Sequence, residues 1–139
     1  MENNHLLIAL SQYGLKETPG AASNPVILQM AKDCGFKDYT SDGIAWCSLF
    51  MNWVMWKALK PRSNSLLARS WINVGEAVQT PVMGDIAVLW RVEPNSPYGH
   101  TGIYISESDT HYYLLSGNTD DMVNIAPFRK DRLLGFRRV

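Results

Sequence analysis

The stretch that decides the fold of this chain is residues 42–54, which read Asp42-Gly43-Ile44-Ala45-Trp46-Cys47-Ser48-Leu49-Phe50-Met51-Asn52-Trp53-Val54. Its apolar residues recur at the spacing of a buried helix face, and we expect a helix from about Cys47 to Leu59, ending before Pro61. Cys47 lies where the loop becomes the helix. The first turn of a helix carries unpaired N–H groups and partial positive charge, which favour a thiolate over a thiol. The stretch therefore predicts a central helix with a reactive cysteine at its start.

Further helices are predicted before the strands along the chain. The 3.6-residue period indicates helices over residues 4–13, 26–34 and 65–74. Strand-like apolar runs follow at residues 86–90, 100–106, 112–115, 123–126 and 133–137. Because the helices come first and the strands follow with short links, we expect an α+β fold with an antiparallel sheet. The helix that carries the cysteine is expected to pack on that sheet.

The composition excludes several classes of protein. A chain of 139 residues fits a single domain, residues 1–139, and 46% hydrophobic with 19% charged residues is typical of a globular protein. Lys plus Arg and Asp plus Glu balance at 13 each, so no global field attracts nucleic acid, and we expect no nucleic-acid partner. No apolar run reaches the roughly 20 residues of a membrane span. The N-terminus lacks a basic leader, which favours synthesis in the cytoplasm without a signal peptide.

Three polar residues stand out in the order cysteine, histidine, asparagine. Cys47 is followed by His100 at the start of a predicted strand and by Asn118 after the next strand. This is the order of catalytic residues in papain-like cysteine hydrolases, in which histidine acts as base and the third residue fixes its tautomer. A cysteine beside an apolar stripe is more often a small core residue, which is how we interpret Cys34. The other histidines are less suitable, because His5 is expected to be exposed and His111 to lie at a loop tip between strands.

Two further points concern the third residue and cofactors. Asp120 and Asp121 are alternatives to Asn118, whose surroundings are also good turn composition. The three histidines are far apart in sequence, and no glycine loop that binds phosphate is present. We therefore expect no metal and no cofactor.

The chain resembles the CHAP and NlpC/P60 cysteine peptidases that cleave bacterial peptidoglycan peptides, and most of all a compact subfamily of that superfamily. The pieces that carry this resemblance run in order along nearly the whole chain: Pro19-Gly20, Asn24-Pro25, Ala45-Trp46-Cys47-Ser48, Phe50, Asn52-Trp53-Val54, Ala68-Arg69-Ser70-Trp71, Pro81, Gly84-Asp85-Ile86, Gly99-His100-Thr101-Gly102, Gly117-Asn118 and Leu133-Leu134-Gly135-Phe136-Arg137-Arg138.

The resemblance implies a papain-like fold and a set of functional residues. Cys47 would be the nucleophile, His100 the general base and acid, and Asn118 the residue that orients the imidazole. Substrate contacts are assigned to Trp46, Ser70, Trp71 and Gly99. The implied reaction is hydrolysis of an amide bond in a stem peptide or cross-bridge of peptidoglycan, through a thioester acyl-enzyme on the cysteine.

The resemblance also implies where the protein acts and on what. Because peptidoglycan lies outside the cytoplasm, we expect release as a phage-type lysin or delivery as an antibacterial effector toxin into the periplasm of a target cell. An effector would have an immunity or inhibitor protein as partner, and we expect the enzyme itself to be a monomer. The alternatives are a non-catalytic peptide-binding module, an acyltransferase, and a thiol protease directed at proteins.

Overall fold

The computed structural model describes residues 3–18, 23–40 and 45–139. Three α-helices come first: α1 (Asn4–Leu10), α2 (Pro25–Asp33) and α3 (Cys47–Ala58). A short 3-10 helix and six strands follow: η1 (Ala68–Asn73), β1 (Glu76–Val78), β2 (Ile86–Trp90), β3 (Gly99–Glu107), β4 (His111–Thr119), β5 (Met122–Arg129) and β6 (Leu133–Arg138), with the turn η2 (Lys130–Arg132) between β5 and β6. The pieces Pro19-Gly20 and residues 42–44 lie outside the described residues.

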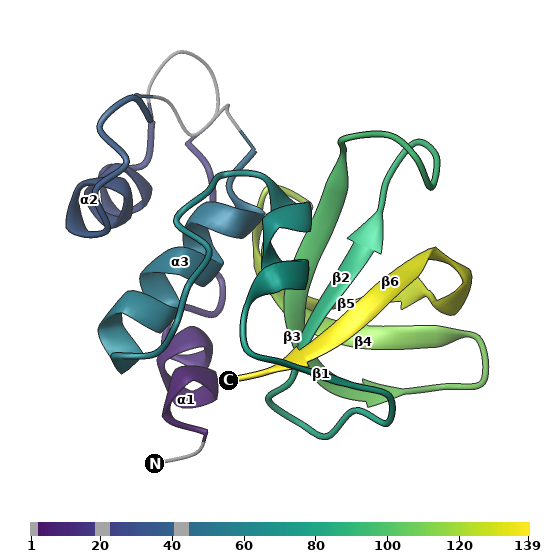
Figure 1. Ribbon diagram of the computed structural model, residues 1–139. Helices are drawn as coiled ribbons and strands as arrows, with labels where there is room; N and C mark the ends of the chain where they lie inside the picture. The colour runs from purple at the N-terminus through teal and green to yellow at the C-terminus, as the bar shows by residue number, and fades with distance from the viewer. Residues whose placement is uncertain (1–2, 19–22, 41–44) are drawn as a thin grey trace.

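The six strands form one antiparallel sheet in the order β1-β6-β2-β3-β4-β5. Figure 1 shows the three helices gathered on one side of this sheet, with α3 between α2 and the strands. The predicted α+β class with an antiparallel sheet is confirmed.

Helix α3 begins at Cys47, as the sequence predicts, and Leu59 ends it in the left-handed conformation. Nearly all of its side chains are buried, because α1 and α2 cover the faces that the sheet does not. Helix α2 begins where Asn24 accepts a 2.8 Å hydrogen bond from the N–H of Val26, with Pro25 in the first turn. The cysteine therefore lies at the start of α3, a helix that packs against α1, α2 and the sheet.

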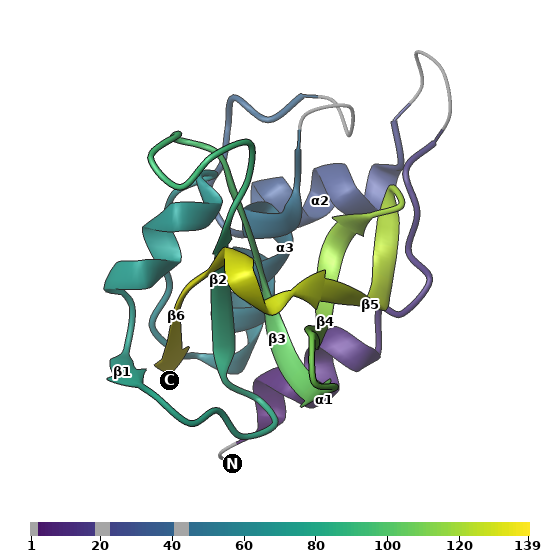
Figure 2. The same cartoon turned by 90° about the vertical axis from the view of Figure 1, so that its right-hand side faces the viewer.

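Alternation along the strands divides the apolar residues between two cores. In β2, Ile86 and Val88 pack under the helices, whereas Ala87 and Leu89 belong to a second cluster with Phe136. The second cluster therefore lies on the opposite face of the sheet, and Figure 2 shows that the sheet is strongly curved. Buried apolar side chains thus lie on both faces of the sheet.

One glycine allows the first turn of α3 to approach the sheet closely. A Cβ atom at Gly117 of β4 would lie 2.8 Å from Cβ of Phe50 and 2.9 Å from the indole ring of Trp46. Real Cβ atoms do not approach so closely, so any larger residue would push α3 away from β4. Gly117 therefore sets the distance between the start of α3 and the middle of the sheet.

The structure differs from the sequence-based expectations in several elements. The helix expected over residues 65–74 is the shorter 3-10 helix η1, and strand β1 was not predicted. His111 begins β4 and does not lie at a loop tip. His5, which was expected to be exposed, is only 2% exposed, because its Nε2 bonds the carbonyl of Gly84 at 2.7 Å and Lys60 approaches its Nδ1 at 2.7 Å.

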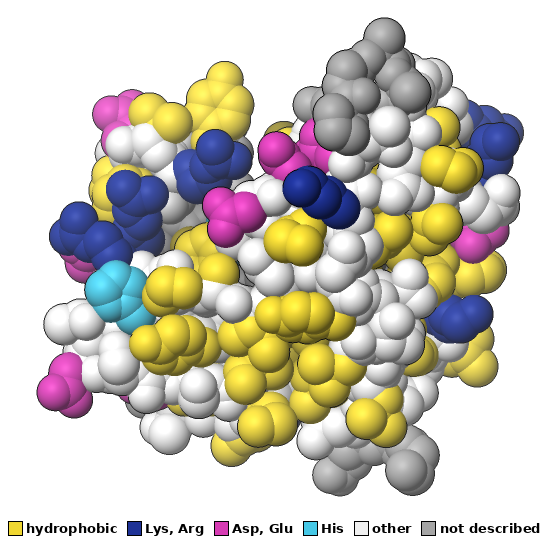
Figure 3. Space-filling model, turned by 180° about the vertical axis from the view of Figure 1, so that it is seen from behind, with side chains coloured by type: hydrophobic (Ala, Val, Ile, Leu, Met, Phe, Trp, Pro, Cys, Tyr) yellow, Lys and Arg dark blue, Asp and Glu magenta, His cyan; other side chains and the backbone are white. Residues whose placement is uncertain are grey.

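The surface carries scattered apolar side chains. Figure 3 shows one face on which apolar side chains gather over a broad area. Among the described residues of the whole surface, Leu7, Trp56 and Leu59 are large exposed apolar side chains. No helix in the described part of the chain is long and apolar enough to cross a membrane. The monomeric state stays a prediction.

Candidate active site

Cys47 is the first residue of α3, and its thiol is buried, with the residue only 6% exposed. The backbone N–H of Thr101 on β3 donates a hydrogen bond toward the sulfur, as does the N–H of Ser48 in the first helical turn. These N–H groups lower the pKa of the thiol, but burial raises it by more, so the net pKa lies above the ordinary value. The helix start was expected to favour a thiolate. In the structure desolvation outweighs it, and the group is a neutral thiol at pH 7.

His100 is the second residue of β3 and is 7% exposed. Its ring stacks on Phe128 with the centroids 4.5 Å apart and the planes 16° apart. Its Nε2 lies 2.9 Å from the hydroxyl of Ser116, which in turn lies 3.1 Å from the hydroxyl of Thr119. Burial, and after it the charge of Arg91, lowers the pKa of His100 to about 3. The imidazole is therefore neutral at physiological pH and can accept a proton.

The structure brings Cys47 to the start of β3, the strand that carries His100. The sulfur faces the N–H of Thr101, which directly follows His100 in the chain. The imidazole stacks on Phe128 and lies beside the hydroxyl of Ser116. The structure gives no hydrogen bond between these two described side chains, and burial keeps both of them neutral at pH 7. Arg91 is charged close enough to lower the pKa of both groups.

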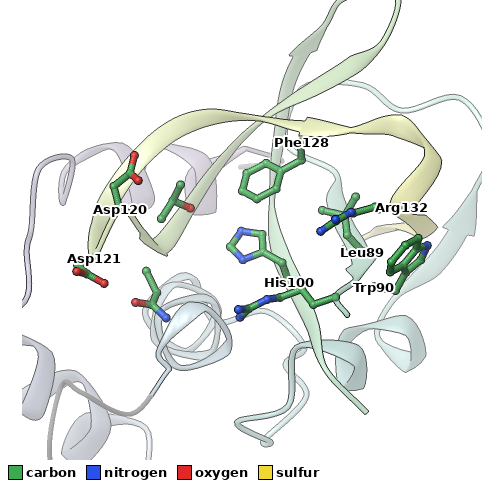
Figure 4. A pocket seen from close by; sticks show the side chains of 10 residues that line it. Leu89, Trp90, His100, Asp120, Asp121, Phe128 and Arg132 are labelled. Carbon is green, nitrogen blue, oxygen red and sulfur yellow. The ribbon is translucent and has the colours of Figure 1, made fainter. Parts of the chain in front are cut away.

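A pocket of about 370 Å³ opens at the imidazole of His100. Figure 4 shows His100 and Phe128 in its middle, Asp120 and Asp121 toward one end, and Trp90 and Arg132 toward the other. Cys47 is not among the described residues that line it. The pocket therefore reaches the predicted base directly, and the buried thiol of the predicted nucleophile does not form part of its wall.

Asn118 lines the same pocket, but the hydrogen bond found at His100 is made by Ser116. Asn118, Asp120 and Asp121 all have positive φ, between 52° and 62°, in the tight connection from β4 to β5. Asn and Asp tolerate this left-handed conformation better than most residues, which agrees with the turn composition of the segment. Asn118 as the orienting residue stays a prediction. Ser116 was not singled out from the sequence, because it follows directly after the strand expected over residues 112–115, whereas β4 extends to Thr119.

The four residues assigned to substrate contacts have different surroundings. Trp46 and Trp71 are both 0% exposed, because their indoles pack in the core and donate to Glu17 and Ser48 respectively. No substrate can touch these two indoles in this structure. Ser70 is half-buried and its hydroxyl donates to the carbonyl of Leu67.

Gly99 begins β3, where an added Cβ would lie 2.7 Å from the carbonyl oxygen of Leu89 and 2.9 Å from the Arg69 side chain. Arg69 fixes the loop between β2 and β3 at this point. Its guanidinium donates to the carbonyls of Tyr98 at 2.7 Å, Pro94 at 2.8 Å and Glu93 at 3.1 Å. This loop leads from Arg91 to His100, so Arg69 holds in place the segment that carries both. Arg69 belongs to the motif Ala68-Arg69-Ser70-Trp71, which by itself predicts no role for the guanidinium.

The remaining candidates lie elsewhere. His5 is held between Gly84 and Lys60, and His111 bonds the hydroxyl of Thr110. Cys34 is buried, and its thiol donates to the carbonyl of Met30 at 3.0 Å, as expected of a packing residue. Within residues 3–18, 23–40 and 45–139, no three His, Cys, Asp or Glu side chains come together in a group that could hold a metal ion.

Comparison with known proteins gives a likeness of fold. One similar solved structure is the P60 domain of an antigen of M. avium paratuberculosis, with a TM-score of 0.52 and 18% sequence identity over 99% of this chain and 92% of that one. No family model matches the chain, and no curated protein matches it. The architecture of helices on an antiparallel sheet is thus consistent with a P60-like fold.

The state of the Cys47 thiol predicts slow alkylation. Since burial raises its pKa above the ordinary value of 9.0, less thiolate is present at pH 7 than in a free cysteine. At pH 7 we expect iodoacetamide to react more slowly with Cys47 than with the free thiol of glutathione. The rate of alkylation of Cys47 should still rise with pH above pH 9. Peptide mass spectrometry separates Cys47 from Cys34, and protein unfolded in guanidinium is the control. A fast rate that is already constant between pH 6 and pH 8 would show a thiolate and contradict this account.

Proposed function

We propose that the protein is a papain-like cysteine peptidase that hydrolyses an amide bond in peptidoglycan peptides. The observation that carries the proposal is the position of the Cys47 sulfur, at a helix start and beside the N–H of Thr101, the residue that follows His100. The P60-like fold supports the substrate class, since the sequence resembles the peptidases that act on cell-wall peptides. The pocket at His100 gives a substrate access to the base.

The proposed reaction starts from a neutral pair. As the sulfur attacks the carbonyl carbon of the amide, His100 takes the thiol proton and an S–C bond forms. The oxyanion receives a hydrogen bond from the N–H of Cys47. His100 then gives the proton to the leaving nitrogen as the C–N bond breaks, which leaves a thioester on Cys47. Water then attacks the thioester carbon while the same imidazole takes its proton. As the C–S bond breaks and the acid is released, the imidazole returns that proton to the Cys47 sulfur.

The tautomer of His100 decides which nitrogen can act as base. Nε2 is engaged with the hydroxyl of Ser116, so Nδ1 is the nitrogen that can take the thiol proton. We propose that Ser116 positions the ring and that Thr119 holds the Ser116 hydroxyl. Asn118 lines the pocket and contributes to substrate binding or to the same positioning.

The burial of Cys47, and the absence of a hydrogen bond between its thiol and the imidazole among the described residues, favour one alternative, a non-catalytic peptide-binding module. Such a module would use the pocket at His100 without attack by the sulfur. An acyltransferase and a protein-directed protease would share the chemistry of the thioester and differ in their products.

The proposed substrate fixes the compartment in which the enzyme acts. Peptidoglycan is found outside the cytoplasm, so we propose activity in the periplasm of a target cell or on the wall after release, as an effector or a lysin. An immunity protein, if the effector role holds, would cover the pocket at His100.

Digestion of purified peptidoglycan tests the proposed function. We expect the protein to release stem-peptide fragments with new amino and carboxyl ends, which mass spectrometry identifies, and we expect Cys47→Ala to release none. Cys34→Ala is the matched control and should digest as the wild type does. Full activity of Cys47→Ala, or intact peptidoglycan with the wild type, would sink the proposal. Fragments linked to a new acceptor would identify an acyltransferase instead.

Replacement of Ser116 and Asn118 separates the two possible positioning residues. Loss of the Ser116 hydrogen bond costs about 1 kcal/mol, so we expect Ser116→Ala to lower kcat about fivefold with little change in KM. Asn118→Ala should mainly raise KM, because Asn118 lines the pocket without bonding the ring. The hydrolysis rates of a soluble stem peptide give both constants. If Asn118→Ala lowered kcat and Ser116→Ala did not, Asn118 and not Ser116 would be the residue that positions the imidazole.

A further inference from the structure

The pocket at His100 carries charged side chains of opposite sign at its two ends. Asp120 and Asp121 lie at the end formed by the connection from β4 to β5, and Arg132 lies at the other end over the ring of Trp90, with its guanidinium carbon 5.0 Å from the ring centroid. Figure 4 shows this separation, with His100 between the two ends. Arg91 also lines the pocket, and its charge reaches both His100 and Cys47.

These charges are unpaired, unlike those around them. Within the described part of the chain, the carboxylates of Asp120 and Asp121 and the guanidiniums of Arg91 and Arg132 form no ion pair and no side-chain hydrogen bond. Charged residues nearby do pair: Lys130 with Glu107, and Arg129 with Asp131. The four pocket charges are therefore free for a ligand, and a buried imidazole that lines the same space marks it as a built site.

We propose that this pocket binds a zwitterionic peptide segment, with its carboxylate at Arg91 and Arg132 and its ammonium group at Asp120 and Asp121. Binding of such a segment does not depend on the proposed function, whereas its role as substrate rests on the proposed peptidase reaction. A segment bound in this way lies across His100, since the imidazole is between the two charged ends. Arginine suits a carboxylate because its planar fork of donors matches the two oxygens.

Binding of a carboxylate at Arg91 would also affect the base. The charge of Arg91 disfavours protonation of His100, second to burial as the cause of its low pKa. A bound carboxylate would offset that charge and raise the pKa of His100, which makes the imidazole a better acceptor for the thiol proton. A substrate with a free carboxylate would thus improve the base that acts on it.

Binding of small peptides tests the inference without turnover. The protein is the full chain with Cys47→Ala, or Cys47→Ser if the alanine variant does not fold, and the probes are trialanine, N-acetyl-trialanine and trialanine amide. NMR titrations give each Kd. We expect each capped peptide to bind about fivefold or more weakly than trialanine, because each cap removes one charge pair. Equal Kd values for the three peptides would overturn the inference.

Charge-neutralising substitutions locate the two subsites. Arg91→Gln should abolish the preference for trialanine over its amide and keep the preference over the acetylated form. The pair Asp120→Asn and Asp121→Asn should do the reverse. The matched control is Arg129→Gln with Asp131→Asn, which removes an arginine and an aspartate outside this pocket and should change neither preference. If the control changed both preferences, binding would lie elsewhere and the inference would fail.

The two proposals fail in different ways. Peptidoglycan cleaved by the wild type together with equal binding of all three peptides would reject the zwitterion pocket and leave the peptidase. Charge-selective binding together with intact peptidoglycan would support the pocket and reject the peptidase.

Discussion

The contact between the first turn of α3 and the middle of the sheet is the constraint on which the rest of the structure depends. Gly117 lets β4 approach Trp46 and Phe50 so closely that a single added carbon would not fit. The same approach places the Cys47 sulfur at the N–H of Thr101. A looser fit between the helix and the sheet would move the sulfur away from β3, which is the strand that carries His100.

Burial dominates the electrostatics of the candidate site. A helix start supplies N–H donors to the Cys47 sulfur, yet desolvation raises its pKa, and desolvation also brings the pKa of His100 down to about 3. Both groups are thus neutral in the ligand-free protein. The proposed chemistry then depends on proton transfer from thiol to imidazole during attack, and not on a standing ion pair.

The sequence predicted what local patterns determine and missed what distant contacts determine. The start of α3 at Cys47 and the bounds of β2 could be read from apolar spacing and from the loop residues around them. The burial of His5 could not, because it depends on a carbonyl 79 residues away in the sequence. Strand β1 is three residues long, mostly exposed and held by pairing with the C-terminal strand, so no periodicity marks it.

The residues of the candidate site also divide into those that local sequence patterns indicate and those that depend on distant contacts. Cys47 and His100 could be proposed from the sequence because each lies at the end of a recognisable element. Trp46 and Trp71 were assigned to substrate from their place in motifs, but their indoles fill the core. Ser116 is identified only by the pairing of β3 with β4, which brings its hydroxyl to Nε2 of His100. Arg91 begins the loop between β2 and β3, and Arg69 holds that loop by hydrogen bonds to its carbonyls. No sequence pattern predicts the shape of this loop.

The central claim is that Cys47 forms a covalent thioester with its substrate. The most direct measurement is intact-protein mass spectrometry of the enzyme mixed with a stem-peptide substrate and quenched in acid within the first turnovers. The account predicts a mass increase equal to the acyl fragment, located at Cys47 by peptide mapping and absent from Cys34. Product that accumulates from the protein while Cys47 stays unmodified at every time point, or an adduct on another residue, would contradict it.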